Sequence, residues 1–78
     1  MYEEICSEIN KIFNINYQKE IGSYDYNLLM DERINSAELA FIIKKIANRY
    51  WSCIHNVKHE FVGEVTINNI IKFINDNK

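Results

Sequence analysis

The chain has 78 residues, which is enough for one domain with a single small core and too few for a two-domain enzyme. Hydrophobic residues make up 47% of the chain and charged residues 26%, a balance typical of globular proteins rather than disordered ones. Proline is absent and glycine occurs twice, which favours helices. The net charge of −2 does not indicate a nucleic-acid partner, because domains that bind nucleic acid usually carry a strongly basic surface.

The charges are distributed unevenly along the chain. Residues 1–38 carry eight acidic and three basic side chains, whereas residues 39–78 carry three acidic and six basic ones. The longest apolar run, residues 39–43, is far shorter than the roughly 20 residues that span a bilayer. Glu3 and Glu4 do not resemble the basic start of a secretory signal, so we expect a cytoplasmic protein without a membrane span.

The first predicted element is a helix over about residues 2–14. Its buried face is predicted from apolar residues spaced at i, i+4, i+7 and i+8, namely Ile5, Ile9, Ile12 and Phe13. Polar residues then interrupt the pattern over residues 14–35, which predicts a long loop pinned to the core by its own apolar side chains. Connections of this length in compact domains are often functional.

The strongest helical periodicity follows, from Ser36 to about Trp51. Asn35 is a good N-cap for this helix, and Glu38 stands three positions on, as in a capping box. The sequence predicts one apolar face for it, formed by Ala37, Ala40, Ile42, Ile43, Ile46, Ala47 and Tyr50.

The remainder of the chain predicts a short helix around Val57–Phe61, a turn at Gly63 and a last helix capped by Thr66. The buried face of the last helix is predicted to be Ile67, Ile70, Ile71 and Ile74. Together these elements predict an all-α fold, a single domain over residues 1–78. It would be a small four-helix bundle of three longer helices and one short one, with a long loop between the first two.

The order of these elements resembles that of acyl carrier proteins over nearly the whole chain. Three segments carry the resemblance: Leu28-Leu29-Met30-Asp31, Ile34-Asn35-Ser36-Ala37-Glu38-Leu39, and the last helix from Thr66 to Ile74. The second is similar to the family's Asp-Ser-Leu motif, although it reads Asn-Ser-Ala here. The Thr-Ile-Asn-Asn-Ile-Ile run and the spacing from Ile54 to Thr66 look most like D-alanyl carrier proteins.

The resemblance implies an acyl-carrier-like fold and a 4'-phosphopantetheine arm on Ser36. In the family this arm holds an acyl, aminoacyl or peptidyl group as a thioester. A phosphate at the start of a helix would lie near free backbone N–H groups and the positive end of the helix dipole. The implied partners are carrier-modifying and acyl- or aminoacyl-handling enzymes that act on a monomer. Where typical fatty-acid carriers have an acidic helix after the serine, this helix carries Lys44, Lys45 and Arg49, which predicts a partner with an acidic surface. Leu39 and Phe41 add apolar area beside them, which would either contact that partner or pack under the long loop.

Two other interpretations of the chain stay open at this point. An unmodified carrier-like adaptor, for example in a peptide-maturation or secondary-metabolite pathway, is favoured by Asn35 and Ala37 in place of the family's Asp and Leu. An independent enzyme would need a nucleophile, a base and an orienting group around a pocket. Ser36, a histidine and Asp31 supply those residue types, but we expect a domain of this size to have little room for a substrate, so no enzyme is predicted.

The cysteines and histidines predict no metal site. Cys53, His55, His59 and Glu60 are suitable ligand types, but structural zinc sites usually combine two closely spaced ligand pairs, and only one pair is present. Cys6 and Cys53 are not in a C-x-x-C pattern. A disulfide between them is formally possible, but two buried thiols are expected in a reducing compartment.

Overall fold

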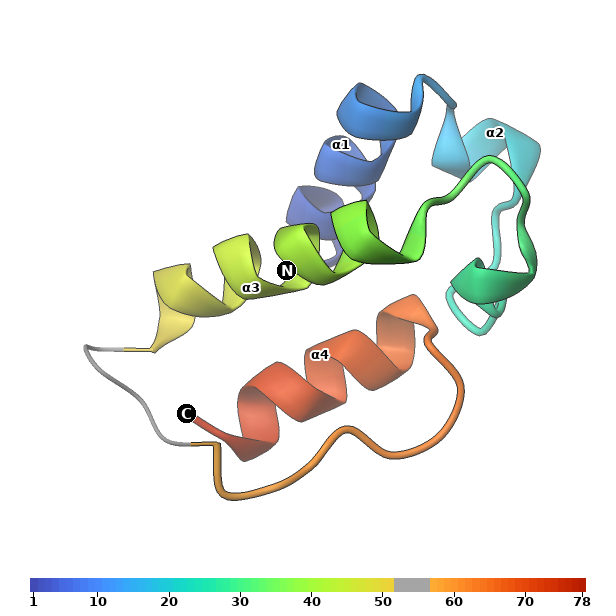
Figure 1. The fold of residues 1–78 in the computed structure, drawn as a ribbon. Helices are drawn as coiled ribbons and strands as arrows, with labels where there is room; N and C mark the ends of the chain where they lie inside the picture. The colour runs from blue at the N-terminus through green and yellow to red at the C-terminus, as the bar shows by residue number, and fades with distance from the viewer. Residues whose placement is uncertain (52–56) are drawn as a thin grey trace.

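The computed structural model describes residues 1–51 and 57–78 and shows an all-α fold (Figure 1). The three longer helices are α1 (Tyr2–Phe13), α3 (Ser36–Tyr50) and α4 (Ile67–Asp76), and each contacts the other two. Two short elements, helix α2 (Tyr17–Glu20) and the 3-10 helix η1 (Leu28–Met30), lie between α1 and α3. In this part of the chain, no helix has both the length and the apolar character that crossing a membrane requires.

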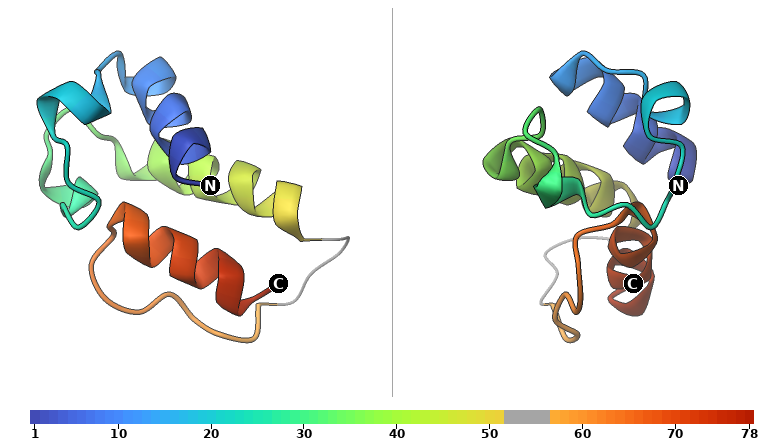
Figure 2. Two further views of the ribbon diagram at one scale, coloured as in Figure 1. Left: turned by 180° about the vertical axis from the view of Figure 1, so that it is seen from behind. Right: turned by 90° about the vertical axis from the view of Figure 1, so that its right-hand side faces the viewer.

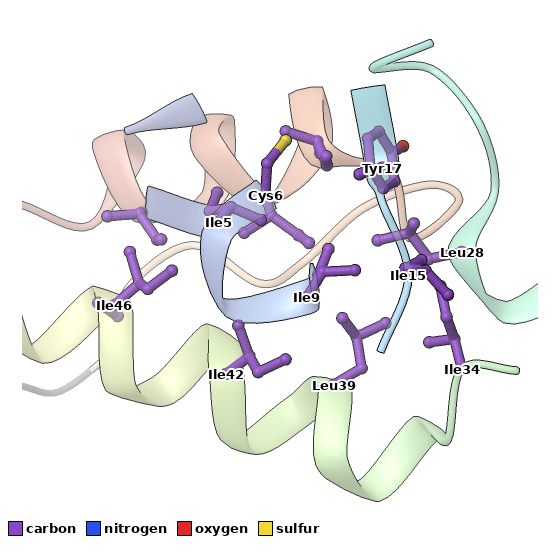
Figure 3. Close-up of a cluster of buried hydrophobic side chains, with 14 residues drawn as sticks. Ile5, Cys6, Ile9, Ile15, Tyr17, Leu28, Ile34, Leu39, Ile42 and Ile46 are labelled. Carbon is purple, nitrogen blue, oxygen red and sulfur yellow. The ribbon is translucent and has the colours of Figure 1, made fainter. Parts of the chain in front are cut away.

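Helix α1 confirms the predicted first helix and ends at Phe13. Ile5 and Ile9 are completely buried, and in Figure 3 they lie across from the α3 side chains of Ile42 and Ile46. The helix stops at Asn14, whose backbone is left-handed with a φ of 54°. Asparagine adopts this conformation at lower cost than most residues, so it suits the end of a helix.

The prediction of a continuous loop over residues 14–35 is wrong, because the segment contains α2 and η1. Asn16 caps α2 by accepting a hydrogen bond from the Lys19 N–H at 3.2 Å. Tyr17 is buried, and its hydroxyl donates to the Ser23 carbonyl oxygen at 2.7 Å. The expected pinning of this connection to the core is confirmed by four buried apolar side chains, Ile15, Tyr17, Leu28 and Ile34.

Helix α3 begins at Ser36 as predicted, and most of its expected face meets the core: Ile42, Ile46 and Ala47 are buried, and Ile43 and Tyr50 pack against the core partly buried. Ala37 and Ala40 are exposed instead, and Leu39 is buried. Leu39 lies one turn before Ile42, and a large apolar side chain there buries more surface than alanine does. The preference for large side chains therefore sets which face of α3 meets the core (Figure 3).

The predicted short helix around Val57–Phe61 is also wrong, since this segment is not helical. Its backbone bonds instead to Asn77, whose side-chain oxygen accepts from the N–H groups of Lys58 and His59, each at 2.8 Å. The expected bend at Gly63 is present, with a φ of 89° that glycine adopts without strain. Residues 57–66 run back along α4 (Figure 2).

Helix α4 follows the prediction closely. The Thr66 hydroxyl caps it by accepting from the Asn69 N–H at 3.0 Å. Ile67, Ile70 and Ile74 are completely buried, and Ile71 is half-buried. α4 packs against α1 and α3 through these isoleucines, which closes one core shared by the longer helices and the 14–35 connection.

Candidate functional site

Ser36 is the first residue of α3, and its side chain is exposed. The residue before it, Asn35, has extended backbone and caps the helix. Its side-chain oxygen accepts hydrogen bonds from the Ala37 N–H at 2.9 Å and the Glu38 N–H at 3.2 Å. Asn35 thereby fixes the start of the helix, and the Ser36 side chain stays accessible to a large reagent such as another protein.

The Asn35 cap corrects one expectation from the sequence. A phosphate on Ser36 was expected near free backbone N–H groups, but those of Ala37 and Glu38 already have an acceptor in Asn35. Such a phosphate would be stabilised by the helix dipole rather than by these two donors. Because the capping group is a neutral amide and not a carboxylate, it would not repel the phosphate charge.

The segment before Ser36 is held in place by buried and charged groups. Ile34 is buried, and its N–H donates to the Asp31 carbonyl oxygen at 3.0 Å. The guanidinium of Arg33 donates two hydrogen bonds to the Asp31 carboxylate, at 3.0 and 2.8 Å. These bonds, with a further one from the Arg33 backbone N–H, lower the pKa of Asp31 to about 2. Asp31 is therefore an anion throughout the physiological pH range.

Phe41 and Lys44 lie on the outer face of α3, as a partner-binding surface requires. The Phe41 side chain is 61% exposed, an unusual position for so large an apolar group, and Lys44 is exposed. Leu39, in contrast, is only 1% exposed and belongs to the core. Its assignment to the partner-binding surface is wrong, because it occupies the turn of α3 that faces the core.

Lys45 and Arg49 are exposed and also form ion pairs within the domain, so their contact with a partner stays a prediction. The Lys45 ammonium lies 3.1 Å from the Glu8 carboxylate, and the Arg49 guanidinium lies 3.1 Å from Glu4 and 3.6 Å from Glu8. The pKa of Glu8 is lowered, mainly by the hydrogen bond from Lys45. That of Glu4 is lowered first by the Tyr50 hydroxyl and then by Arg49. These cations hold α3 against α1.

Two apolar side chains of the Leu28–Asp31 segment are exposed, although neither was predicted from the sequence to lie on a binding surface. Leu29 is 50% exposed and Met30 is 75% exposed, both in η1. Only Leu28 of this three-residue helix reaches the core. The apolar run at residues 28–30 could have indicated this exposed pair, because an element of three residues buries one side chain and leaves its neighbours in solvent.

The candidate metal ligands do not form a site in the described residues. Cys53 and His55 lie outside those residues, as does Ile54, so the spacing from Ile54 to Thr66 is not described. Within residues 1–51 and 57–78, no three His, Cys, Asp or Glu side chains gather as a metal site would need. Cys6 is a buried free thiol, and burial raises its pKa.

A surface hollow of about 670 Å³ lies between residues 58–63 and the outer face of α4. It is a hollow open to solvent on the surface, so the expectation that the domain has little room for a substrate pocket stays a prediction. Phe73 and Val62 contribute apolar surface there, and Lys58 and Glu60 contribute exposed charges. Ser36 does not line the hollow.

Comparisons with protein-family models, with curated proteins and with solved structures give no match for this chain. The exposed Ser36 at the start of α3 is therefore the feature from which a function is proposed.

Proposed function

We propose that this domain is a carrier protein that holds an acyl or aminoacyl group through 4'-phosphopantetheine on Ser36 and delivers it to separate enzymes. The observation that carries the proposal is the exposed Ser36 at the first position of α3, directly after the Asn35 cap. The order of the helices, with a long connection before α3 and a non-helical run over residues 57–66 before α4, supports an acyl-carrier-like fold.

The proposed modification is a phosphoryl transfer from coenzyme A. The Ser36 oxygen forms a bond to the phosphorus that carries the pantetheine. The bond from that phosphorus to the bridging oxygen of the pyrophosphate breaks, and adenosine 3',5'-bisphosphate leaves. A base of the transferase takes the hydroxyl proton. Ser36 has no catalytic task in this step, and it needs only to be accessible and well placed.

A carrier contributes by proximity and not by catalysis. A flexible arm on a folded domain keeps its thioester at a high effective concentration near each docked enzyme. α3 is a rigid attachment point for the arm, because Ile42 and Ile46 on its inner face are completely buried. We propose that the domain acts as a monomer in the cytoplasm.

The partner enzymes are proposed to contact the outer face of α3. Phe41 supplies most of the apolar area there, and Lys44 supplies a positive charge that is exposed. A matching enzyme would offer an apolar depression for Phe41 with an acidic group beside it. Lys45 and Arg49 contribute less to this surface, because Glu4 and Glu8 neutralise them.

The test is modification by a broad-specificity phosphopantetheinyl transferase with coenzyme A, followed by intact-protein mass spectrometry. Wild type should gain the mass of one phosphopantetheine, and Ser36→Ala should gain none. Ser7→Ala is the matched control, since Ser7 is an exposed serine on α1, and it should be modified like wild type. Ser36→Ala should stay folded, because alanine suits a helix and Asn35 still caps it.

The second candidate is an unmodified carrier-like adaptor, which Asn35 and Ala37 favour. Both departures from Asp-Ser-Leu lie at the exposed start of α3, where a transferase would bind. If wild type stays unmodified and the Asn35→Asp, Ala37→Leu double variant gains mass, the adaptor explains the chain better. The same fold would then be a competent substrate that has lost its recognition motif.

A further inference from the structure

Arg33 joins two separate parts of the connection that leads to Ser36. Besides its paired bonds to Asp31, its guanidinium donates a hydrogen bond to the Glu20 carboxylate of α2 at 2.8 Å. Glu20 and Arg33 are 13 positions apart, so this bond spans the connection. The other oxygen of Glu20 accepts from the Asn16 N–H at 2.5 Å, at the start of α2.

Asp31 is the fixed point of this arrangement. Its side chain is 8% exposed, whereas those of Arg33 and Glu20 are 44% and 43% exposed. It accepts from the guanidinium and backbone N–H of Arg33, and from the Tyr26 hydroxyl at 3.3 Å. A guanidinium held at two points by one carboxylate keeps little rotational freedom, so it reaches Glu20 in a defined direction.

We propose that Arg33 is a positioning residue for Ser36. Bound to Asp31 and to Glu20 of α2, it holds residues 31–35 in one arrangement, and this arrangement presents Ser36 to the modifying enzyme. The inference rests on the proposed carrier function. It extends that function by assigning a task to a side chain that neither touches Ser36 nor lies on the outer face of α3.

The physical reason is the entropy of ordering a loop. Residues 31–35 leave η1 and enter α3, and Ile34 is the buried apolar side chain among them. Without the bonds from Arg33 to Glu20, the first half of this segment would sample more conformations. A transferase would then have to order it on binding, which lowers the rate of productive association.

The experiment compares the rate of Ser36 modification in variants of opposite charge change. Arg33→Gln removes a positive charge, Glu20→Ala removes a negative charge, and Arg33→Lys keeps the charge but loses the two-point contact. All three should lower kcat/KM of the transferase by about two- to fivefold, the size expected for one exposed ion pair. Lys72→Gln is the matched control: it breaks the exposed Lys72–Asp76 pair on α4 and should react like wild type.

A second readout does not depend on the transferase. Amide hydrogen exchange at Ile34 should become about two- to fivefold faster in Arg33→Lys and Glu20→Ala, while exchange at the buried Ile70 of α4 stays unchanged. A loss of stability of the whole domain would instead make amide exchange faster at both Ile34 and Ile70.

The outcomes separate the two proposals. If wild type and all variants gain mass at equal rates, the carrier function stands and the positioning role of Arg33 is overturned. If Arg33→Gln and Glu20→Ala change the rate in opposite directions, Arg33 acts through charge alone, which also overturns positioning. If wild type gains no mass, the carrier function fails and positioning for transfer falls with it; the exchange at Ile34 then shows only whether Arg33 orders the segment.

Discussion

Asn77 and His59 are joined by two hydrogen bonds in opposite directions. The Asn77 side-chain oxygen accepts from the His59 N–H, and its amide nitrogen donates to the His59 carbonyl oxygen, both at 2.8 Å. Asn77 is buried, follows the last residue of α4, and also donates to the Phe73 carbonyl oxygen at 2.9 Å. A single side chain therefore replaces the hydrogen bonds that a helix would have supplied to residues 58–59.

Asn77→Ala should lower the free energy of unfolding by about 1–3 kcal/mol, because it removes hydrogen bonds to four partly buried backbone groups of Lys58, His59 and Phe73. Asn77→Asp should also destabilise the fold, since a carboxylate cannot donate to the carbonyl oxygens of His59 and Phe73. Asn75→Ala, at an exposed position of the same helix, is the control and should have little effect. Urea denaturation followed by circular dichroism measures all three, and equal stabilities would contradict the anchoring role of Asn77.

Ile70→Ala should cost about 2–5 kcal/mol of unfolding free energy, because Ile70 is completely buried in a small core. Ile71→Ala should cost less, since Ile71 is only half-buried. Thermal melts of the two variants provide the comparison. Equal losses would mean that α4 does not pack on the face described here.

Lys44→Glu and Lys45→Glu make the same charge change at adjacent positions with different expected results. Lys44 is exposed, so the free energy of unfolding of Lys44→Glu should lie within about 0.5 kcal/mol of the wild-type value. Lys45→Glu should lose about 1 kcal/mol or more, because it faces the nearly buried Glu8 carboxylate with a like charge. In a partner-binding assay the order should reverse, with Lys44→Glu weakening association more. Urea denaturation and partner binding are measured on both variants. Equal stabilities, or weaker binding by Lys45→Glu than by Lys44→Glu, would contradict the prediction.

Stability should fall in acid. The pKa of Glu8 is held below its ordinary value by Lys45, and that of Asp31 is held at about 2 by Arg33. Because these folded-state values are lower than those of the unfolded chain, the unfolded chain binds more protons in this range. The contribution of these two carboxylates to the free energy of unfolding should therefore be fully present above the ordinary carboxylate pKa of about 4.5. It should decline as the pH falls toward about 2.

Variants identify which carboxylates cause the acid loss. Asp31→Asn and Glu8→Gln should be less stable than wild type at pH 7 and should lose less stability on acidification. Glu64→Gln, at an exposed carboxylate, should follow the wild-type profile. Melting temperatures measured from pH 7 to pH 2 test this, and a wild-type slope in Asp31→Asn would remove Asp31 from the explanation.

The features that the sequence alone predicted are those set by local interactions. The spans of α1, α3 and α4 follow from apolar spacing, and the caps by Asn35 and Thr66 follow from side chains that bond the N–H groups two or three residues on. The exposure of Ser36 follows as well, because the first residue of a capped helix has no turn before it. Each of these depends on residues only a few positions apart.

Tertiary packing decided the remainder. Leu39 replaced Ala37 and Ala40 on the buried face of α3, because the core accepts the direction that buries the most apolar area. Lys45 and Arg49 form ion pairs because α1 places Glu8 and Glu4 beside them, 37 to 45 positions away in the sequence.

The segment at 57–61 and the approach to Ser36 were settled in the same way. Residues 58–59 bond to Asn77, about 18 positions further on, and so need no helix of their own. The bond of Arg33 to Glu20 likewise depends on how α2 packs. Hydrogen bonds and ion pairs between residues distant in sequence have no periodic signature along the chain, so only the folded arrangement of the helices shows which partners meet.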